Sequence, residues 1–438
     1  MPEGVEDLLA AYDKQLRGRL PRFPPVGAAV ERSGPVVCIH YDTHATVDHG
    51  DVTGVDMDGL IRRQLDVFAE RGEPVEWKVH LHDSAQLGDS LQRAGFTAGW
   101  ERSVLVVPLG DLVTLTGSPG RQRVREEFDR RCLERVRRLA ADSGPHRTSL
   151  EQLQADGRQP YWETRTVILE DEVRVLAAGW AERVHDSDFV SLGGLTLPHP
   201  QLVTALASWA RRQQRPDYAG SPIRTPQYFV AEATGDLRVM LLQMGFQEIT
   251  TAQSYHWAPS TPARVSRPVT RLFSDPEHDA IWRAFYDRFA FKPSTEMYPG
   301  ISEPAASVTW HLAAVHGGDD PLVDQLQDVI ERGLRACTPT GEMLYFLDWN
   351  HAGYRFDPAR VGSHGRPRWP GMAYPHDDYY LYVTADLRMG TFGHPWECSL
   401  CVFGSDLLAE VEEGLTALLG TVLRRGGRNV GNMWTFGP

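Results

Sequence analysis

Apolar and polar positions follow helical or strand spacing through the first hundred residues of the chain. Apolar residues within 60–68 fall on one face of a helix that ends near Gly72. Residues 75–81 alternate between apolar and polar, which is typical of a strand. A short helix is predicted over 83–91 and a further strand over 100–107. This part of the chain is therefore predicted to be a helix–strand–helix–strand unit.

The same order of elements returns later in the chain. A helix predicted over 202–212 and a strand over 227–232 precede a second helix and a second strand. In both copies a Leu-x-x-x-Gly-Phe segment ends the second helix, with its glycine at Gly95 and, 150 residues later, at Gly245. Glycine is favoured just after a helix C-terminus, and the phenylalanine can bury the turn. The repeated unit predicts an internal duplication.

A third region follows residues 258–263, whose two prolines are typical of a linker. Its pattern predicts helices over 277–290, 322–334 and 406–423, and strands over 308–312, 343–348, 379–383 and 397–403. The chain is thus predicted to be of the α/β (α+β) class. Two mixed-sheet halves, 1–115 and 116–258, precede a separate α+β domain with an antiparallel sheet, 267–438.

Composition and charge narrow the class of protein. The 438 residues are 42% hydrophobic and 24% charged, as in globular proteins, and the net charge of −13 disfavours nucleic acid and anionic membranes as partners. No apolar run approaches the roughly 18 residues of a membrane span, and the N-terminus lacks the apolar core of a signal peptide. The five cysteines are scattered, which suits a reducing compartment. A cytoplasmic protein without a membrane partner is expected.

An arginine-rich segment lies between the two copies. Apolar residues from Val124 to Leu139 fall at helical spacing, and eight arginines occupy the remaining positions of Arg121–Arg138. One interpretation is a solvated helix whose arginines pair with the interleaved acidic residues. The other is a helix that faces phosphate groups, and this leaves tRNA as a nucleic-acid partner to consider.

The stretch 342–404 concentrates histidine, carboxylate and aromatic residues between strand-like runs. Its candidate catalytic or ligand-binding residues are Asp348, His351, Asp378, His394 and Glu397. Because an antiparallel sheet brings distant strand ends together, we expect Asp348, His351, Asp378 and His394 to converge on a pocket walled by Trp349 or Trp396. The alternative is an aromatic-rich sheet whose carboxylates cap turns and whose histidines point to opposite faces.

No motif predicts a metal. The His and Asp residues of 44–51 match no metal-binding spacing. Cys398 and Cys401 form a Cys-x-x-Cys, but they lie in an alternating strand that would point them to opposite faces. We therefore expect no metal ligand.

Residues 30–258 resemble the GNAT acetyltransferase superfamily. The resemblance is carried by the repeated Gly-Phe, by Val75-Glu76-Trp77-Lys78 and by His82-Asp83. It implies two acetyltransferase-like halves and an N-acyltransferase that passes an acyl group from acetyl-CoA or another acyl-CoA to a small-molecule amine. In the family a strand splays from its neighbour to bind the cofactor, and that strand corresponds here to Leu192, Gly193, Gly194, Leu195 and Thr196. Glu232 would then orient the amine, unless it is only a strand-end carboxylate in solvent.

Two family features are missing. The glycine-rich pyrophosphate loop is replaced by residues 197–203, which contain two prolines and no glycine, and Met240 stands where a tyrosine acid often occurs. Proline cannot donate an amide hydrogen bond, so weak or absent acetyl-CoA binding is expected. Two alternatives stay open: a non-catalytic scaffold that carries a C-terminal ligand- or partner-binding domain, and a transferase that uses aminoacyl-tRNA.

Residues 267–438 resemble a bacterial family known as domain of unknown function 2716. The motifs that carry the resemblance are Leu347-Asp348-Trp349-Asn350-His351, Tyr374-Pro375, Asp378-Tyr379-Tyr380 and Phe392-Gly393-His394-Pro395-Trp396-Glu397. That family implies no activity, so the chemistry of this domain has to be argued from its residues.

Overall fold

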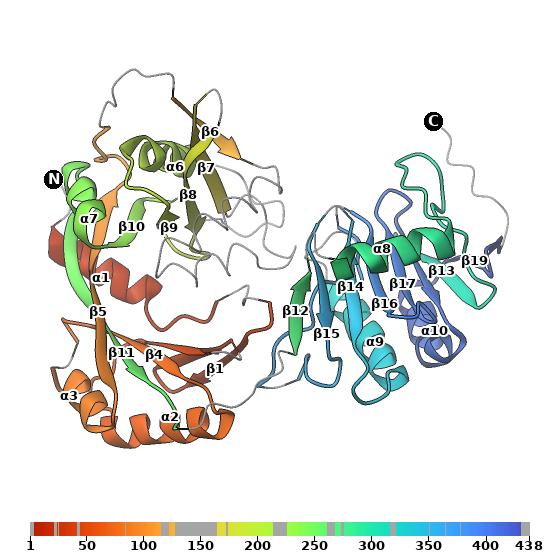
Figure 1. Cartoon of the computed structure of the whole chain (residues 1–438), viewed down its shortest axis with the longest axis horizontal. Coiled ribbons are helices and arrows are strands. Elements are labelled where there is room, and N and C mark those ends of the chain that lie inside the picture. Colours follow the sequence, from red (N-terminus) through yellow and green to blue (C-terminus); the bar gives the residue numbers. More distant parts are fainter. Residues whose placement is uncertain are drawn as a thin grey trace. The chain divides into compact units, whose positions relative to one another are not determined.

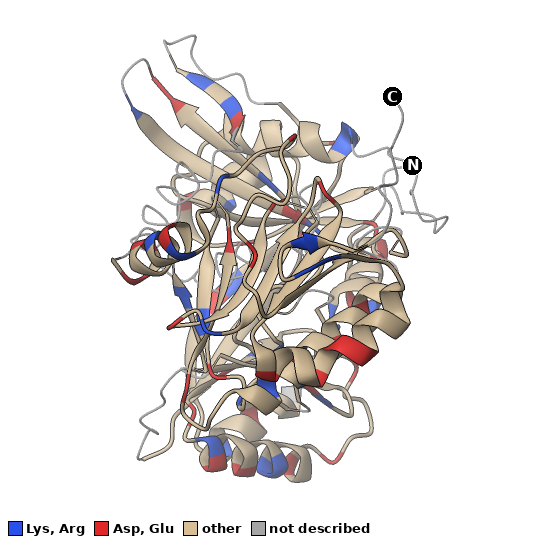
Figure 2. Cartoon of the chain, turned by 90° about the vertical axis from the view of Figure 1, so that its right-hand side faces the viewer, with Lys and Arg blue, Asp and Glu red and all other residues tan. Residues whose placement is uncertain are grey.

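The structure of the chain is a computed structural model with two compact units, Met1–Val265 and Ser266–Pro438 (Figure 1). It describes residues 4–21, 24, 26–41, 44–83, 85–114, 122–127, 164–171, 174–212, 226–260, 268–272, 276–315, 321–349, 351–363, 365–376 and 378–430. Among these residues, none of the helices combines the length and the apolarity that crossing a bilayer requires. Acidic and basic residues alternate along several elements, which spreads the charge (Figure 2).

The described strands of unit 1 form one mixed sheet in the order β1-β2-β3-β4-β11-β5-β10-β9-β8-β7-β6. The strands are β1 (Ala29–Ser33), β2 (Val36–His40), β3 (Ala45–His49), β4 (Val75–His80), β5 (Thr97–Pro108), β6 (Arg123–Glu127), β7 (Thr164–Glu170), β8 (Val175–Arg183), β9 (Phe189–Leu195), β10 (Tyr228–Ala233) and β11 (Gln247–Trp257). The helices are α1 (Val5–Leu16), α2 (Met57–Arg71), α3 (Ala85–Arg93), α6 (Pro200–Arg212) and α7 (Gly235–Gln243).

The two halves of unit 1 exchange their last strands. β11, from the second half, lies between β4 and β5 of the first, and β5 pairs in turn with β10 of the second. Tyr255 and Trp257 of β11 therefore pack against the core under α2 and α3. Leu105 and Val107 of β5 pack under α6 and α7. Each half therefore contributes a strand to the other, and the two halves share one continuous sheet.

The repeated turns have the same geometry in both halves. Gly95 and Gly245 adopt φ values of 94° and 92°, a left-handed conformation that favours glycine. The amide of the following phenylalanine donates to a leucine carbonyl five residues back, over 3.0 Å in the first half and 3.1 Å in the second. Both phenylalanines are buried. The repeated sequence thus builds the same helix end twice.

The helix predicted over Arg121–Arg138 is wrong where the structure describes it. Residues 123–127 form the edge strand β6, which pairs antiparallel with β7. Arg123 and Arg125 alternate along this strand, and both donate to the carboxylate of Glu170, at 2.8 and 3.1 Å. Alternating Arg and Val positions satisfy strand spacing as well as helix spacing, and the cross-strand ion pairs favour the strand. Residues 128–163 lie outside the described residues.

The described strands of unit 2 form an antiparallel sheet in the order β12-β15-β14-β16-β17-β18-β13-β19-β20. The strands are β12 (Val269–Leu272), β13 (Ser307–His311), β14 (Leu344–Asp348), β15 (Gly353–Phe356), β16 (Tyr380–Thr384), β17 (Gly390–His394), β18 (Ser399–Phe403), β19 (Val422–Arg425) and β20 (Arg428–Asn429). The helices are α8 (Pro276–Phe289), α9 (Pro321–Cys337) and α10 (Ser405–Leu419).

Helices cover both faces of the unit 2 sheet. Phe285 of α8 stacks on Phe392 of β17, with ring centroids 6.0 Å apart, in a core that also holds Leu347 and Leu381. On the other face, Gln327 of α9 donates to the Tyr382 hydroxyl at 3.3 Å. Since successive strand residues point to opposite faces, this assigns every residue of β14, β16 and β17 to the α8 face or the α9 face.

Candidate functional site

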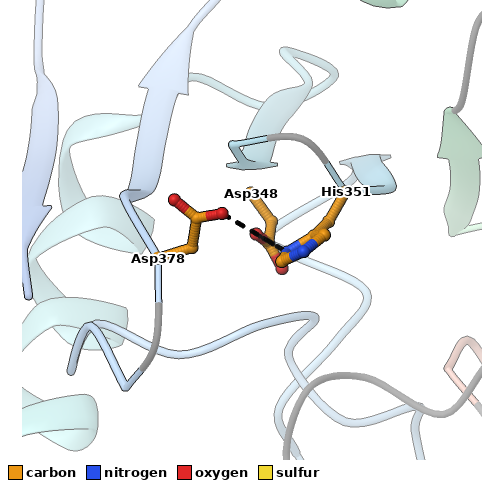
Figure 3. A group of neighbouring side chains, drawn as sticks. All are labelled: Asp348, His351 and Asp378. Atoms are coloured by element: carbon orange, nitrogen blue, oxygen red, sulfur yellow. Dashed lines mark hydrogen bonds and ion pairs between the residues drawn. The ribbon is translucent and has the colours of Figure 1, made fainter. Parts of the chain in front are cut away.

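Three of the predicted residues of unit 2 come together (Figure 3). His351 Nδ1 contacts Asp348 Oδ1 and lies 3.8 Å from Asp378 Oδ2. Each residue offers one ligand atom, and the three atoms all lie within 4.8 Å of one another. Asp348 and Asp378 are 7% and 6% exposed, so both carboxylates are held away from bulk water. We call Asp348, His351 and Asp378 the Asp–His–Asp cluster.

Strand register explains why the cluster forms. Asp348 is the last residue of β14 and pairs with Tyr380, the first residue of β16, so Asp378 arrives beside it from the incoming chain. The His351 amide donates to the Asp348 carbonyl at 3.0 Å, and this turn folds the imidazole back over the strand end. Asp348 follows Phe346 at strand spacing, which places it on the α9 face.

His394 lies with a different set of neighbours. It follows Phe392 at strand spacing on the α8 face, and its ring contacts those of Tyr298, Tyr379 and Trp396, with centroids 5.1, 4.8 and 6.0 Å away. The side chain is fully buried, and burial lowers the pKa of His394 to about 4. Its Nδ1 accepts from the Glu397 amide at 3.1 Å, and Nε2 is buried without a hydrogen-bond partner among the described residues.

The two tryptophans that were predicted to wall the pocket, Trp349 and Trp396, lie on the same side as His394 and not on the side of the Asp–His–Asp cluster. Trp349 packs edge-on against Tyr379 at 5.7 Å and donates from Nε1 to the Tyr286 hydroxyl of α8 at 2.9 Å. Trp396 contacts Tyr379 at 5.1 Å and is 40% exposed. The residues that were predicted to share one pocket thus lie on two faces of the sheet. Asp348 lies on the α9 face, and His394, which contacts Tyr379, lies on the α8 face.

Glu397 serves an ion-pair network. Arg424 of β19 donates to both of its carboxylate oxygens, at 2.6 and 2.7 Å, and to Glu303 at 2.8 Å. Burial opposes ionisation of Glu397, but the Arg424 guanidinium holds the pKa of that carboxyl below its usual value. Arg424 was not singled out in the sequence because its partners lie 27 and 121 residues away.

Unit 1 contains a gap between two parallel strands. β9 and β10 pair from Phe189–Tyr228 to Ser191–Val230 and then separate. On its other side β9 stays paired with β8, with a register shift that leaves Gly193 as an extra residue between Leu192 and Gly194. A Cβ on either glycine would lie 2.4 Å from the Trp180 ring, so only glycine fits. The predicted cofactor-binding strand, Leu192 to Thr196, is therefore the edge of this gap.

At the end of that edge, Thr196 is hydrogen-bonded to β8. Its amide donates to the Ala178 carbonyl at 2.9 Å, and its hydroxyl accepts from the Ala178 amide at 2.8 Å. The backbone of Thr196 is thus engaged with β8, whereas Leu192 to Leu195 border the gap.

Glu232 lies on β10, two residues beyond Val230, the last residue that pairs with β9. Its carboxylate accepts from Lys78 Nζ at 2.8 Å and lies 3.8 Å from Arg102 Nη1. Burial opposes the charge on Lys78, but the neighbouring Glu232 carboxylate raises the pKa of that ammonium. Glu232 is therefore an ion-paired, half-buried residue. Lys78 belongs to the Val-Glu-Trp-Lys motif, but its pair with Glu232 was not predicted from the sequence.

The α1 helix supplies a buried tyrosine beside this pair. The Tyr12 hydroxyl lies 3.0 Å from Nε2 of His80, and both side chains are buried. Burial raises the pKa of Tyr12, and burial together with the Lys78 and Arg17 cations lowers the pKa of His80. His80 is thus neutral at pH 7. No sequence pattern predicted this contact, which joins residues 68 positions apart.

The equivalent gap of the first half is filled. β3 and β4 pair only from Ala45–Val75 to Val47–Trp77, and the chain after α1 then crosses the opening. The side chain of Arg17 is 6% exposed, and it donates to Asp83 at 2.6 Å. The Gly18 amide donates to Asp48 at 3.0 Å, and a Cβ on Gly18 would lie 2.4 Å from the Gly50 nitrogen. Among the described residues, Arg17 and Gly18 thus lie across the end of the β3–β4 pairing.

The helices that follow the two gaps differ at their N-termini. In the first half the Asp56 carboxylate accepts from the Gly59 amide at 3.1 Å, so α2 is capped by its own negative charge. In the second half α6 begins at Pro200, which lacks an amide hydrogen. The Asp56 carboxylate therefore disfavours an anion at the N-terminus of α2. The N-terminus of α6 has no such carboxylate cap among the described contacts, but it has one backbone amide donor fewer than a helix that begins without proline.

Comparison with known proteins separates the two units. Residues 272–408 match a family described as protein of unknown function (DUF2716), which confirms the resemblance predicted for the C-terminal domain. The chain is also similar to a Bacillus subtilis (strain 168) protein described as uncharacterized protein YxiI. The two are 27% identical over 148 residues, which are 32% of this chain and 91% of that protein.

Solved acetyltransferase structures are similar to a larger part of the chain. A GCN5-related N-acetyltransferase from Kribbella flavida is 15% identical, with a TM-score of 0.41, over 60% of this chain and 97% of its own. A tandem GNAT protein from the clavulanic acid biosynthesis pathway is 12% identical, with a TM-score of 0.40, over 59% of this chain and 97% of its own. At these identities and TM-scores the similarity does not establish an activity, so the chemistry of unit 1 has to be derived from its own residues.

Proposed function

We propose that unit 1 is an N-acyltransferase that binds an acyl thioester in the gap between β9 and β10 and transfers the acyl group to a small-molecule amine. The observation that carries this proposal is the gap itself. Parallel pairing stops at Ser191 and Val230, and Glu232 follows Val230 by two residues on β10. An extended pantetheine arm can complete the unpaired strand edge with hydrogen bonds, as a strand would.

The residues at the opening suit amine acylation. The amine nitrogen attacks the thioester carbonyl carbon, the C–N bond forms, the C–S bond breaks, and the thiolate leaves. Glu232 accepts the proton that the amine loses and passes it to solvent, and the leaving thiolate takes a proton from water, so that charge balances. Lys78, 2.8 Å from Glu232, keeps the carboxylate ionised before the amine arrives.

Only the second half takes part in this proposal. Arg17 and Gly18 cross the gap of the first half, and Asp56 occupies the start of α2. The first half would therefore serve as a scaffold that supplies Lys78 and strand β5 to the second. This arrangement assigns one thioester site to a duplicated unit.

The cofactor is expected to bind weakly. Pro200 removes one amide donor from the start of α6, and a charge-assisted hydrogen bond contributes about 1.5–3 kcal/mol. Loss of one such bond corresponds to about a ten- to hundredfold weaker dissociation constant. Acetyl-CoA, or an acyl-CoA with a longer chain that adds apolar contact, remains the donor we propose.

Two alternatives make different predictions. A non-catalytic scaffold would bind no thioester and transfer no acyl group. A transferase that uses aminoacyl-tRNA would need a basic surface near the gap, but the described part of the arginine-rich segment is an edge strand that pairs with Glu170. The described part of this segment thus gives no support to a tRNA partner. The strand gap, which suits a pantetheine arm, supports a thioester donor.

The test compares two carboxylates of the same sheet. Acetyl-CoA and octanoyl-CoA are titrated into the full chain by calorimetry, and thiol release is followed with a panel of amines. We expect Glu232→Gln to lower the transfer rate about a hundredfold or more while leaving thioester binding unchanged. Glu76→Gln is the matched control, because Glu76 lies on β4, 3.8 Å from His256 and outside the Lys78 pair.

Two results would overturn the proposal. The first is the absence of any calorimetric signal with both thioesters, which favours the non-catalytic scaffold. The second is acyl transfer that falls equally in the Glu232→Gln and Glu76→Gln variants, because the position of Glu232 at the gap would then be irrelevant.

A further inference from the structure

We propose that the Asp–His–Asp cluster of unit 2 is a binding site for a divalent transition-metal ion such as Zn²⁺ or Mn²⁺. This inference is independent of acyl transfer by unit 1. It assigns a ligand to residues Asp348, His351 and Asp378, which the strand register brings to one end of the sheet (Figure 3).

The donor atoms are spaced for a common ion. Metal–ligand bonds from His and Asp are about 2.0–2.2 Å long, so two ligands of one ion lie at most about 4.4 Å apart. The three donor atoms of the cluster all lie within 4.8 Å of one another, and His351 Nδ1 is 3.8 Å from Asp378 Oδ2. A shift of the donor atoms by a few tenths of an ångström is therefore enough for all three to reach one ion.

Burial and charge favour a dication at this position. Asp348 and Asp378 are 7% and 6% exposed, and two carboxylates that face each other away from water repel strongly. A divalent ion adds two positive charges between these carboxylates, and it takes the place of the proton between His351 Nδ1 and Asp348 Oδ1.

The chemistry of the donors selects the class of metal. One imidazole and two carboxylates suit Zn²⁺, Mn²⁺ or Fe²⁺, whereas Ca²⁺ and Mg²⁺ prefer oxygen alone and Cu⁺ prefers thiolate. Three protein ligands leave at least one coordination position for water or a substrate oxygen. The cluster therefore resembles a catalytic metal site in its ligand number more than a closed structural one.

The orientation of Asp378 is already set for binding. Its Oδ1 accepts from the Tyr379 amide at 2.8 Å, and this leaves Oδ2 toward His351. Tyr379 is in turn anchored, because its hydroxyl donates to the Ser294 carbonyl and accepts from the Ser294 amide, both at 2.8 Å. Fixed neighbours of this kind hold a ligand in its binding rotamer and raise metal affinity.

The absence of a metal motif in the sequence has a physical reason. Asp348 and His351 belong to one turn, but Asp378 follows His351 by 27 residues and enters from a different strand. Metal motifs that can be recognised in a sequence place their ligands on one loop or helix. A site assembled across strands leaves no such spacing.

The experiment uses the full chain after dialysis against EDTA. Equilibrium dialysis with Zn²⁺ or Mn²⁺ alone, with bound metal measured by mass spectrometry, should give one ion per chain. We expect Asp378→Asn and His351→Gln each to weaken binding about tenfold or more. Asp279→Asn is the matched control, because the exposed Asp279 also lies beside a histidine, 4.0 Å from His278, and among the described residues it belongs to no group that could hold a metal.

A spectroscopic measurement on the unchanged chain covers variants that fail to fold. Electron spin echo modulation of bound Mn²⁺ should show coupling to one imidazole nitrogen, and this coupling should be retained in the Asp279→Asn variant. The proposal is overturned if the unchanged chain takes up less than a stoichiometric amount of both metals. It is equally overturned if bound Mn²⁺ shows no nitrogen coupling, or if folded Asp378→Asn and His351→Gln variants bind as the unchanged chain does.

Discussion

At the scale of single residues, burial decides which groups carry charge. His394 is fully buried among aromatic rings, and it therefore stays neutral well below the pH at which an exposed histidine ionises. Glu397, three residues further on, stays ionised because Arg424 pairs with both of its oxygens. Two residues of one predicted site thus have opposite electrostatic roles, which only their neighbours explain.

The low pKa of His394 predicts that unit 2 loses stability in acid. The folded pKa of about 4 is lower than the ordinary value of 6.5, so the unfolded state binds more protons between these two values. Stability from this group is complete above pH 6.5 and is lost as the pH falls toward 4, by about 3 kcal/mol. Urea unfolding of the full chain at pH 7, 5.5 and 4 measures this loss.

A variant isolates the contribution of His394. His394→Gln removes the titrating group, so its stability should fall less steeply between pH 7 and pH 4 than that of the unchanged chain. Other buried histidines such as His80 are present in both proteins and cancel in the comparison. Parallel pH profiles of the two proteins would contradict this account of His394.

At the scale of elements, the beginning of α6 is where the proposed function expects the phosphates of the thioester to bind. A helix N-terminus binds an anion through its free amides and its positive dipole, and Pro200 removes the first of those amides. Pro198, on the preceding segment, is exposed and likewise lacks an amide hydrogen. The start of α6 thus offers the proposed thioester fewer amide donors than a helix that begins without proline.

Restoring an amide should therefore strengthen binding. Pro200→Ala adds one N–H to the start of α6, and we expect the acetyl-CoA dissociation constant to fall about tenfold. Calorimetry with the Pro200→Ala chain measures the change, and Pro276→Ala, at the start of α8 in unit 2, is the control for a helix-initial proline elsewhere. An unchanged dissociation constant in Pro200→Ala would place the phosphates away from α6.

At the scale of the whole molecule, strand exchange ties the halves of unit 1 together. β11 supplies the partner of β4, and its Tyr255 and Trp257 pack against the core under α2 and α3. Without these residues the first half would expose both a long strand edge and an apolar surface. Unit 2, by contrast, has its own sheet and its own core.

We therefore predict that the halves cannot fold separately. A fragment of residues 1–115 should lack a cooperative thermal transition, whereas fragments 1–265 and 266–438 should each show one. Circular dichroism and the dispersion of amide signals in NMR spectra distinguish these outcomes. A cooperatively folded 1–115 fragment would mean that β5 can pair with β4 in place of β11.

Local pattern was enough to predict most helices and strands, because spacing and turn residues act over a few positions. The Gly-Phe turns at Gly95 and Gly245 show this directly, since each forms from its own neighbours. The same local reasoning was wrong for residues 123–127, where alternating residues fit two periods and pairing with β7 decided between them.

Contacts between distant strands were decided only by the tertiary structure. The convergence of Asp348 and Asp378 depends on register, and the position of His394 depends on which face of the sheet its strand presents. The Lys78–Glu232 pair and the crossing of the first gap by Arg17 depend on strand exchange and on the path of the chain after α1. A sequence records the chemistry of each side chain, whereas burial, partner and charge state are properties of the folded neighbourhood.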